Sequence, residues 1–289
     1  MQRFVRNTLG AACLAACSLS ATAITLVGLT SANQIARIDT SNFSAATTTA
    51  ITGLAAGDRF VGIDLRPKDN KIYGVTLSSK LYTVDELTGA TTFVAALSSP
   101  VIQASLGYGI DFNPVADFGA GASLRLVSSA GSNFAINAAT GVVGNAASNI
   151  GSGFTGVSYS NSKPLLVAAP ASTALYYINS NTDMLMVANS AFNAPTINAV
   201  GALGVDVLKA NGFEVLGNGM AYAALNVDDG SSLVTGLYTI NLATGAASLQ
   251  GQFNGTLSGL TVSAVPEPQT AGLMLAGLLA MGMLARRRR

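Results

Sequence analysis

The chain has 289 residues, of which only 10% are charged, with 31 glycines and no histidine. The lack of histidine excludes Ser-His-Asp and Cys-His triads, and metal sites built on imidazole. Residues 24–265 carry nine Lys or Arg against thirteen Asp or Glu, which excludes a basic nucleic-acid-binding face. A weakly charged, glycine-rich chain of this length is typical of one all-β domain with many short strands.

The first 23 residues are predicted to be an export signal. Arg3 and Arg6 form a basic start, residues 8–16 are apolar, and residues 21–23 (Ala-Thr-Ala) match the small-x-small pattern that signal peptidase cuts after. We therefore expect the mature chain to begin at Ile24. In a second interpretation, "LAAC" (residues 14–17) is a lipobox, and an acylated Cys17 becomes the first residue.

The body, residues 24–264, contains a repeated segment of glycine, an aliphatic residue and a small polar residue. Successive glycines of this segment are 47, 47, 48 and 55 residues apart. Four-stranded blades of a β-propeller have repeats of about 40–50 residues. The five copies are VGIDLRP with Gly62, YGIDFNP with Gly109, TGVSYSN with Gly156, LGVDVLK with Gly204 and SGLTVSA with Gly259.

A second repeated segment predicts a strand followed by a tight turn. Its Asp or Asn side chain can accept hydrogen bonds from the backbone of the turn, and the glycine that closes three of its four copies supplies a positive φ. The four copies are LYTVDELTG (81–89), NFAINAATG (133–141), LYYINSNTD (175–183) and LYTINLATG (237–245).

The two ends of the body predict a closed ring. GLTSANQIARID (28–39) matches GVTLSSKLYTVD (74–85) at a constant offset of 46, so the body begins on the second strand of a repeat. The last segment, SGLTVSA, is a first strand without successors. We therefore predict an all-β, five-bladed β-propeller in which the N- and C-terminal strands close one blade. An open β-solenoid or a sandwich is the alternative.

These segments also resemble the DUF4394 family of secreted bacterial repeat proteins, over nearly the whole body. The resemblance supports a propeller and implies no activity. One departure from the family is a Gly/Ala insertion in NPVADFGAGASLRLVSS (113–129), which predicts a longer loop after Asn113.

The best candidates for chemistry are Asp64, Asp111 and Asp206. They occupy equivalent places in three of the five repeats, where Ser158 and Thr261 occupy the other two, so we expect them to ring the central channel. Converging carboxylates are ligands for Ca²⁺ or a pair for glycosidic acid/base catalysis. The interpretation we favour is that each Asp caps the turn of its own blade. No catalytic residue and no cofactor other than this candidate Ca²⁺ is predicted.

The last 25 residues, 265–289, have three parts. A short motif comes first, followed by 16 uncharged residues (270–285). A helix that crosses a membrane needs about 20 residues, so this predicted membrane span is at the short limit. A basic cluster follows and would stop the span on the inner side. The motif is Pro266, Glu267 and Pro268, and the cluster is Arg286, Arg287, Arg288 and Arg289.

These three parts, in this order, resemble the PEP-CTERM sorting signal of Gram-negative bacteria. The resemblance implies recognition and cleavage by an exosortase, and association with the cell surface or with exopolysaccharide. A plain single-pass anchor is the alternative.

The sequence thus predicts an exported cell-surface or extracellular-matrix protein with a non-catalytic structural or binding propeller. Its processing partners are signal peptidase and an exosortase. It contacts the inner membrane through the C-terminal helix before processing and then reaches the outer surface. The alternative is a carbohydrate-active enzyme or sugar-binding module that uses the channel carboxylates.

Overall fold

The computed structural model describes residues 23–99, 102–145, 149–208, 212–228 and 233–265. In this part of the chain, twenty strands and one short 3-10 helix form five antiparallel sheets of four strands each. The core of the predicted export signal, with Cys17, and the sorting tail from Pro266 onward lie outside the described residues.

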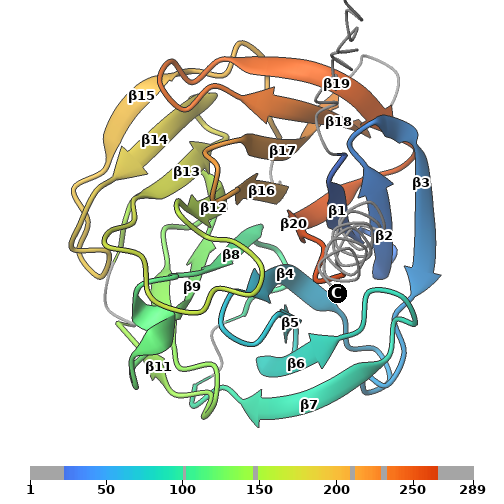
Figure 1. Cartoon of the computed structure of the whole chain (residues 1–289), viewed down its shortest axis with the longest axis vertical. Coiled ribbons are helices and arrows are strands. Elements are labelled where there is room, and N and C mark those ends of the chain that lie inside the picture. Colours follow the sequence, from blue (N-terminus) through green and yellow to red (C-terminus); the bar gives the residue numbers. More distant parts are fainter. Residues whose placement is uncertain (1–22, 100–101, 146–148, 209–211, 229–232, 266–289) are drawn as a thin grey trace, which may run out of the picture.

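The five sheets are the blades of a propeller, with β20, β4, β8, β12 and β16 around the centre and β3, β7, β11, β15 and β19 at the rim (Figure 1). Blade 1 consists of β20, β1, β2 and β3, and blades 2 to 5 consist of β4–β7, β8–β11, β12–β15 and β16–β19. The predicted five-bladed propeller is confirmed. The bounds are β1 Thr25–Thr30, β2 Gln34–Asp39, β3 Asn42–Ala50, β4 Phe60–Arg66, β5 Lys71–Thr76, β6 Lys80–Val84, β7 Thr91–Ala96, β8 Tyr108–Phe112, η1 Ala116–Phe118, β9 Leu124–Ser128, β10 Asn133–Ile136, β11 Val143–Gly144, β12 Phe154–Tyr159, β13 Leu175–Asn179, β14 Met184–Ala188, β15 Asn198–Ala202, β16 Gly212–Val215, β17 Ala221–Asp228, β18 Leu233–Ile240, β19 Ala247–Phe253 and β20 Leu257–Val262.

Blade 1 closes the ring as the sequence predicts. β20, from the end of the body, pairs antiparallel with β1, from its start, and places Val27 opposite Thr261 and Gly28 opposite Leu260. Blade 1 therefore has four strands like the other blades, and β20 covers the edge of β1 that would otherwise lack a strand partner.

The innermost strands are buried on both faces. Every residue of β8 and β12 is buried, whereas most of β3 at the rim is exposed. Blades pack face to face near the centre, so side chains from both sides of an inner strand contact a neighbouring blade. At the interface of blades 2 and 3, for example, the rings of Tyr73 and Phe112 make an edge contact with centroids 5.3 Å apart.

The predicted strand and turn form at all four repeated segments. In blade 2, Oδ1 of Asp85 accepts hydrogen bonds from the backbone of Leu87 and Thr88, and Gly89 has φ +70°. Asn137 with Gly141, and Asn241 with Gly245, repeat this arrangement after the third strands of blades 3 and 5. At 175–183 the N–H of Asn181 donates to Asn179 Oδ1, and Asp183 takes the positive φ, +53°, in place of a glycine. This segment differs in its place, because it is β13, the second strand of blade 4.

Candidate functional site: a buried carboxylate cluster in the central channel

Each innermost strand places one polar side chain at the same level of the channel. All five of these side chains are buried, with at most 3% of each residue exposed. They come from β4, β8, β12, β16 and β20 and are Asp64, Asp111, Ser158, Glu214 and Thr261.

Four of these side chains bind the backbone of the next blade. In each case the donor is the residue that directly follows the equivalent position in that blade. The bonds are Phe112 N–H to Asp64 Oδ2 (2.8 Å), Tyr159 N–H to Asp111 Oδ1 (3.0 Å), Val215 N–H to Ser158 Oγ (2.8 Å) and Leu65 N–H to Thr261 Oγ1 (3.0 Å). Asp64 and Asp111 therefore join blades, and the expectation that they cap turns of their own blades is wrong.

Three of the five side chains bring carboxylates together. Oxygens of Asp64, Asp111 and Glu214 all lie within 4.8 Å of one another. The Thr261 hydroxyl donates a 2.8 Å hydrogen bond to Asp64 Oδ1. Oε2 of Glu214 is fully buried and has no hydrogen-bond partner among the described residues.

The protonation of this cluster is strongly perturbed. Burial raises the pKa of Asp64 to about 7, in spite of the hydrogen bonds from Phe112 and Thr261. Burial, and then the charge of Asp64, raises the pKa of both Asp111 and Glu214 well above the usual range for carboxyl groups. Three such groups at this spacing carry an energetic cost that a proton or a bound cation would relieve.

Asp206 does not belong to the cluster, which corrects the sequence prediction. It is exposed, in the connection between β15 and β16. The innermost strand of blade 5 is Gly212–Val215, and Glu214 occupies the position that the repeat pattern assigned to Asp206. A signal for Glu214 exists in the sequence, because it precedes Tyr222 of the second strand by 8 residues, as Asp64 precedes Tyr73 by 9.

The channel is narrow beside the cluster. Two residues before each polar position, the innermost strands carry glycines that line a cavity of about 10 Å³, which is room for roughly one water molecule. These glycines are Gly62, Gly109, Gly156, Gly212 and Gly259.

The other end of the channel is covered by the β12–β13 connection, residues 160–174, which crosses in front of β8 toward blade 2 (Figure 1). The N–H of Leu166 in this loop donates to the carbonyl of Pro67, 3.1 Å away, and Ser162 forms a bridge with Leu216 of blade 5. The loop thus connects blades 4, 2 and 5, and the carboxylates lie between it and the glycine layer.

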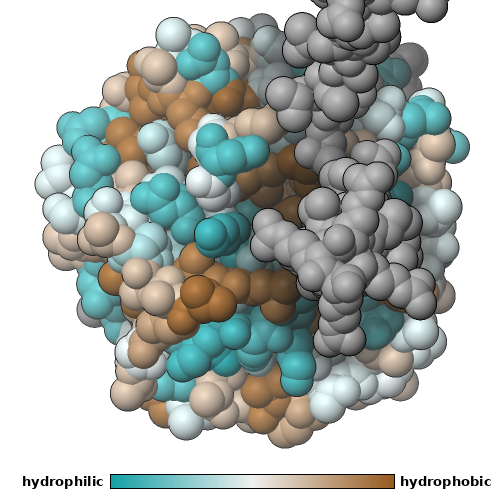
Figure 2. All heavy atoms as spheres, in the orientation of Figure 1, coloured by the Kyte–Doolittle hydropathy of each residue, from teal (hydrophilic) through white to brown (hydrophobic). Residues whose placement is uncertain are grey.

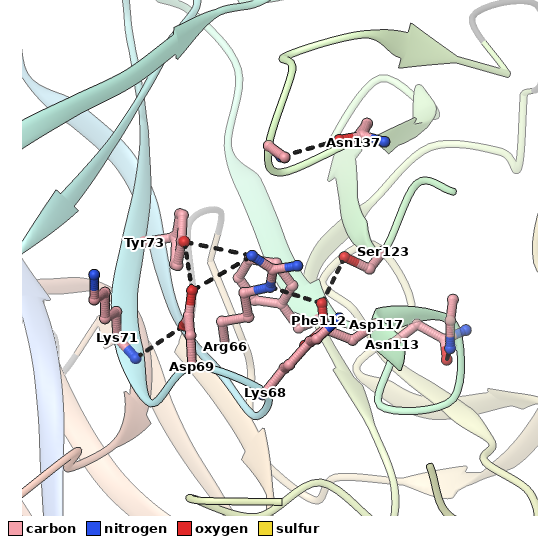
Figure 3. Close-up of polar contacts among 12 residues, drawn as sticks. Arg66, Lys68, Asp69, Lys71, Tyr73, Phe112, Asn113, Asp117, Ser123 and Asn137 are labelled. Carbon is pink, nitrogen blue, oxygen red and sulfur yellow. Dashed lines mark hydrogen bonds and ion pairs between the residues drawn. The ribbon is translucent and has the colours of Figure 1, made fainter. Parts of the chain in front are cut away.

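An ion-pair network next to this loop joins blades 2 and 3 (Figure 3). Nε of Arg66 lies 2.7 Å from Oδ1 of the buried Asp117, which also accepts a hydrogen bond from the Ser123 hydroxyl. On its other side the Arg66 guanidinium lies 3.4 Å from Asp69, which accepts a hydrogen bond from the Tyr73 hydroxyl. Asp117 belongs to η1 in the loop 113–123, the one with the Gly/Ala insertion, while the equivalent connection in blade 2 spans only 67–70.

Glu86, in the turn after β6, fixes the last described residues. Its buried carboxylate accepts hydrogen bonds from the backbone of Ala264 and Val265 at 2.8 and 3.2 Å and from the Ser263 hydroxyl. Arg37 of blade 1 pairs with the same carboxylate at 3.0 Å. The segment directly before Pro266 is therefore held against blades 1 and 2.

Comparison with protein families decides the identity of the body. The family described as "Domain of unknown function (DUF4394)" matches residues 34–261, most of the chain. The chain belongs to this family. The PEP-CTERM protein-sorting motif matches residues 264–289, so both resemblances noted in the sequence are confirmed.

This DUF4394 protein is thus an exosortase-sorted PEP-CTERM protein with a propeller body of unknown function, and the motif implies export to the cell surface. Among the residues that the structure describes, no helix is long and apolar enough to cross a membrane. The predicted tail helix, 270–285, lies outside them.

None of the curated proteins matches the chain. Three solved structures to which this DUF4394 protein is similar have TM-scores below 0.5, and they indicate nothing about its function. They are a structural genomics protein of unknown function from Bacteroides thetaiotaomicron (13% identity, 78% of this chain and 57% of that chain, TM-score 0.46), the calcium-binding protein regucalcin from Agrobacterium tumefaciens (14%, 72% and 63%, 0.39) and BamB from Moraxella catarrhalis (12%, 83% and 89%, 0.31).

Proposed function

We propose that this chain is a cell-surface or extracellular-matrix protein of a Gram-negative bacterium whose propeller is a non-catalytic structural or binding body. The observation that carries the proposal is the enclosure of Asp64, Asp111 and Glu214, of which no more than 3% is exposed. A large substrate cannot reach these converging acidic groups. We therefore infer that the body acts through contacts on its outer surface.

The same enclosure opposes a carbohydrate-active enzyme. A glycosidase needs its two carboxyl groups on either side of a scissile bond, with a sugar ring between them. Here the oxygens lie within 4.8 Å of one another, next to a cavity of about 10 Å³ that cannot hold a sugar ring. Asp64 and Asp111 accept hydrogen bonds from the backbone of the next blade, which supports a role in holding blades together.

The outer surface favours polar or mixed partners such as exopolysaccharide. On the face drawn in Figure 2, hydrophobic residues gather in several separate groups among hydrophilic ones. Of the most exposed large apolar side chains, Val167 and Leu165 lie on the loop 160–174, next to the exposed Lys163. A surface of this kind suits a soluble body that is presented to polymers outside the cell.

The hydrogen bonds of Glu86 to residues 263–265 support the idea that the sorting tail begins directly at the surface of the propeller. Pro266, the first residue of the sorting motif, directly follows the fixed Val265. An exosortase that cuts near the motif would therefore work beside blades 1 and 2, and the released body would carry almost no flexible stem.

Fractionation of the native host tests the proposal. We expect wild-type cells to hold the protein at the outer surface or in the medium. Cells that lack the exosortase, and cells with Pro266, Glu267 and Pro268 all changed to Ala, should hold it in the inner membrane. Equal surface amounts in all three strains would contradict the sorting part.

Incubation of the purified protein with the host's exopolysaccharide tests the non-catalytic part. We expect no release of reducing ends. Release that is abolished by Asp64→Asn and by Asp111→Asn would establish the carbohydrate-active alternative instead.

A further inference from the structure

We propose that Asp64, Asp111 and Glu214 bind one Ca²⁺ ion in the central channel and so connect blades 2, 3 and 5. The donors come from three strands that are far apart in the sequence, and their oxygens lie within 4.8 Å of one another. Ligands of a single Ca²⁺ at 2.3–2.6 Å are at most about 5.2 Å apart, so this spacing fits one ion.

The unpartnered oxygen of Glu214 points to a ligand. Oε2 is buried, and the residue is only 3% exposed, yet among the described residues this atom has no hydrogen-bond partner. A buried carboxylate oxygen without a partner costs about 1–3 kcal/mol or more, so native proteins normally provide one. Asp64 and Asp111 differ from Glu214 in this respect, since each accepts a hydrogen bond from a neighbouring blade.

The chemistry of the donors selects the ion. Three carboxylates are hard oxygen ligands, and the hydroxyls of Ser158 and Thr261 lie at the same level of the ring. Softer transition metals prefer imidazole or thiolate, and the chain has no histidine, while both cysteines precede the body. Mg²⁺ keeps several waters in its shell, for which the adjoining cavity of about 10 Å³ leaves little room. Ca²⁺ has a flexible geometry and accepts six to eight oxygens of this kind.

The charge balance also favours a cation. The oxygens of the three carboxyl groups lie within 4.8 Å of one another in a buried place, where like negative charges repel strongly. A divalent ion offsets two of the three negative charges and turns repulsion between blades into attraction.

The test uses the mature protein, purified with calcium present and then passed into metal-free buffer. Elemental analysis should find about one Ca²⁺ per chain, and removal of the ion with EDTA should lower the midpoint of thermal unfolding, which added Ca²⁺ restores. Loss of a hydrogen-bond partner outside the metal's own ligands weakens metal binding roughly 10–100-fold. Because Glu214 is proposed as a direct ligand, the Glu214→Gln variant should lose more Ca²⁺ affinity than that. In EDTA this variant should be at least as stable as the wild type, because it lacks one of the repelling charges.

Glu86→Gln is the matched control, since Glu86 is a buried glutamate outside the channel with its own partners. It should lose some stability and keep the full response to Ca²⁺. Terbium bound to the wild-type protein and excited through the tyrosines of the propeller, of which Tyr159 is joined to Asp111 through its backbone N–H, gives a measurement that needs no variant. A wild-type protein without bound metal, with an unfolding midpoint that Ca²⁺ leaves unchanged and no terbium signal that Ca²⁺ displaces, would overturn the proposal. An unchanged Ca²⁺ affinity in Glu214→Gln would also overturn it.

Discussion

The backbone N–H of Phe112 in blade 3 donates a 2.8 Å hydrogen bond to Oδ2 of Asp64 in blade 2. An innermost strand has a strand partner on one edge only, so N–H groups on its other edge face the channel without a sheet partner. The polar side chain of the preceding blade supplies the missing acceptor. The arrangement recurs at three further blade interfaces and explains why Asp, Ser or Thr follows the inner glycine by two positions in blades 1 to 4.

Ser158→Ala tests this arrangement without changing charge. The variant leaves the buried N–H of Val215 without its acceptor, now 2.8 Å away. We expect a loss of about 1–3 kcal/mol in the free energy of unfolding, the usual cost of an unsatisfied buried donor. Urea denaturation measures it, with Ser172→Ala, at an exposed serine, as the control. Equal stability of the two variants would show that the Ser158 bond is dispensable.

Gly212→Ala tests the close approach of inner strands. A Cβ at this position would lie 2.5 Å from the backbone nitrogen of Leu260 in blade 1, and a backbone atom cannot move aside as a flexible side chain can. Forcing extra atoms into a packed core costs about 1–3 kcal/mol, and this change should reach the upper end or prevent folding. The control is Gly121→Ala, where a Cβ meets nothing within 4 Å. Circular dichroism melting compares the two, and a Gly212→Ala midpoint equal to that of the control would be incompatible with the structure.

Asp117→Asn tests the ion pair that η1 provides. Arg66 would keep its position but lose the negative charge 2.7 Å from Nε. We expect a loss of about 1–3 kcal/mol, the range for a hydrogen bond to a charged group or for a buried group left without its partner. Asp69→Asn in the same network should cost at most about 1 kcal/mol, because the Asp69 side chain is 30% exposed and its pair with Arg66 is long, at 3.4 Å. If urea denaturation showed a larger loss of stability for Asp69→Asn than for Asp117→Asn, the loop 113–123 would not be what holds blades 2 and 3 together.

Glu86→Ala should release the residues ahead of the sorting motif. In the wild type the amides of Ala264 and Val265 donate to the buried Glu86 carboxylate and should exchange slowly with solvent. The variant should exchange both amides rapidly while the propeller strands stay protected. Hydrogen–deuterium exchange of the mature protein measures this, with Asn241→Ala, which removes the cap of the equivalent exposed turn in blade 5, as the control. Unchanged protection at residues 264 and 265 would show that Glu86 does not hold the segment.

The fold was predictable because closure depends on repeats that are visible in the sequence. Glycines near 47-residue intervals and Asn- or Asp-initiated turns indicate blades, and the offset between residues 28–39 and 74–85 indicates that β20 completes blade 1. The cluster was only partly predictable, since Gly204-Val205-Asp206 imitates the repeated segment within a connection. Alignment on the second strand would have selected Glu214, because its distance from Tyr222 is nearly that of Asp64 from Tyr73.

The role of Glu86 left no local signal in the sequence. Its partners Ala264 and Val265 are 178 and 179 residues away along the chain, and only ring closure brings them to the turn after β6. For the same reason the ion pair of Arg66 with Asp117, 51 residues apart, depends on how two neighbouring blades are packed rather than on any motif.

Intact-mass spectrometry of the protein from the native envelope and from the culture medium tests the central claim, that the chain is an exported propeller whose tail is removed during sorting. We predict a species that begins at Ile24 and ends between Pro266 and Pro268, with the propeller intact up to the segment that Glu86 holds. A mature surface form that retains Arg286, Arg287, Arg288 and Arg289 would contradict the claim and make the tail a permanent anchor.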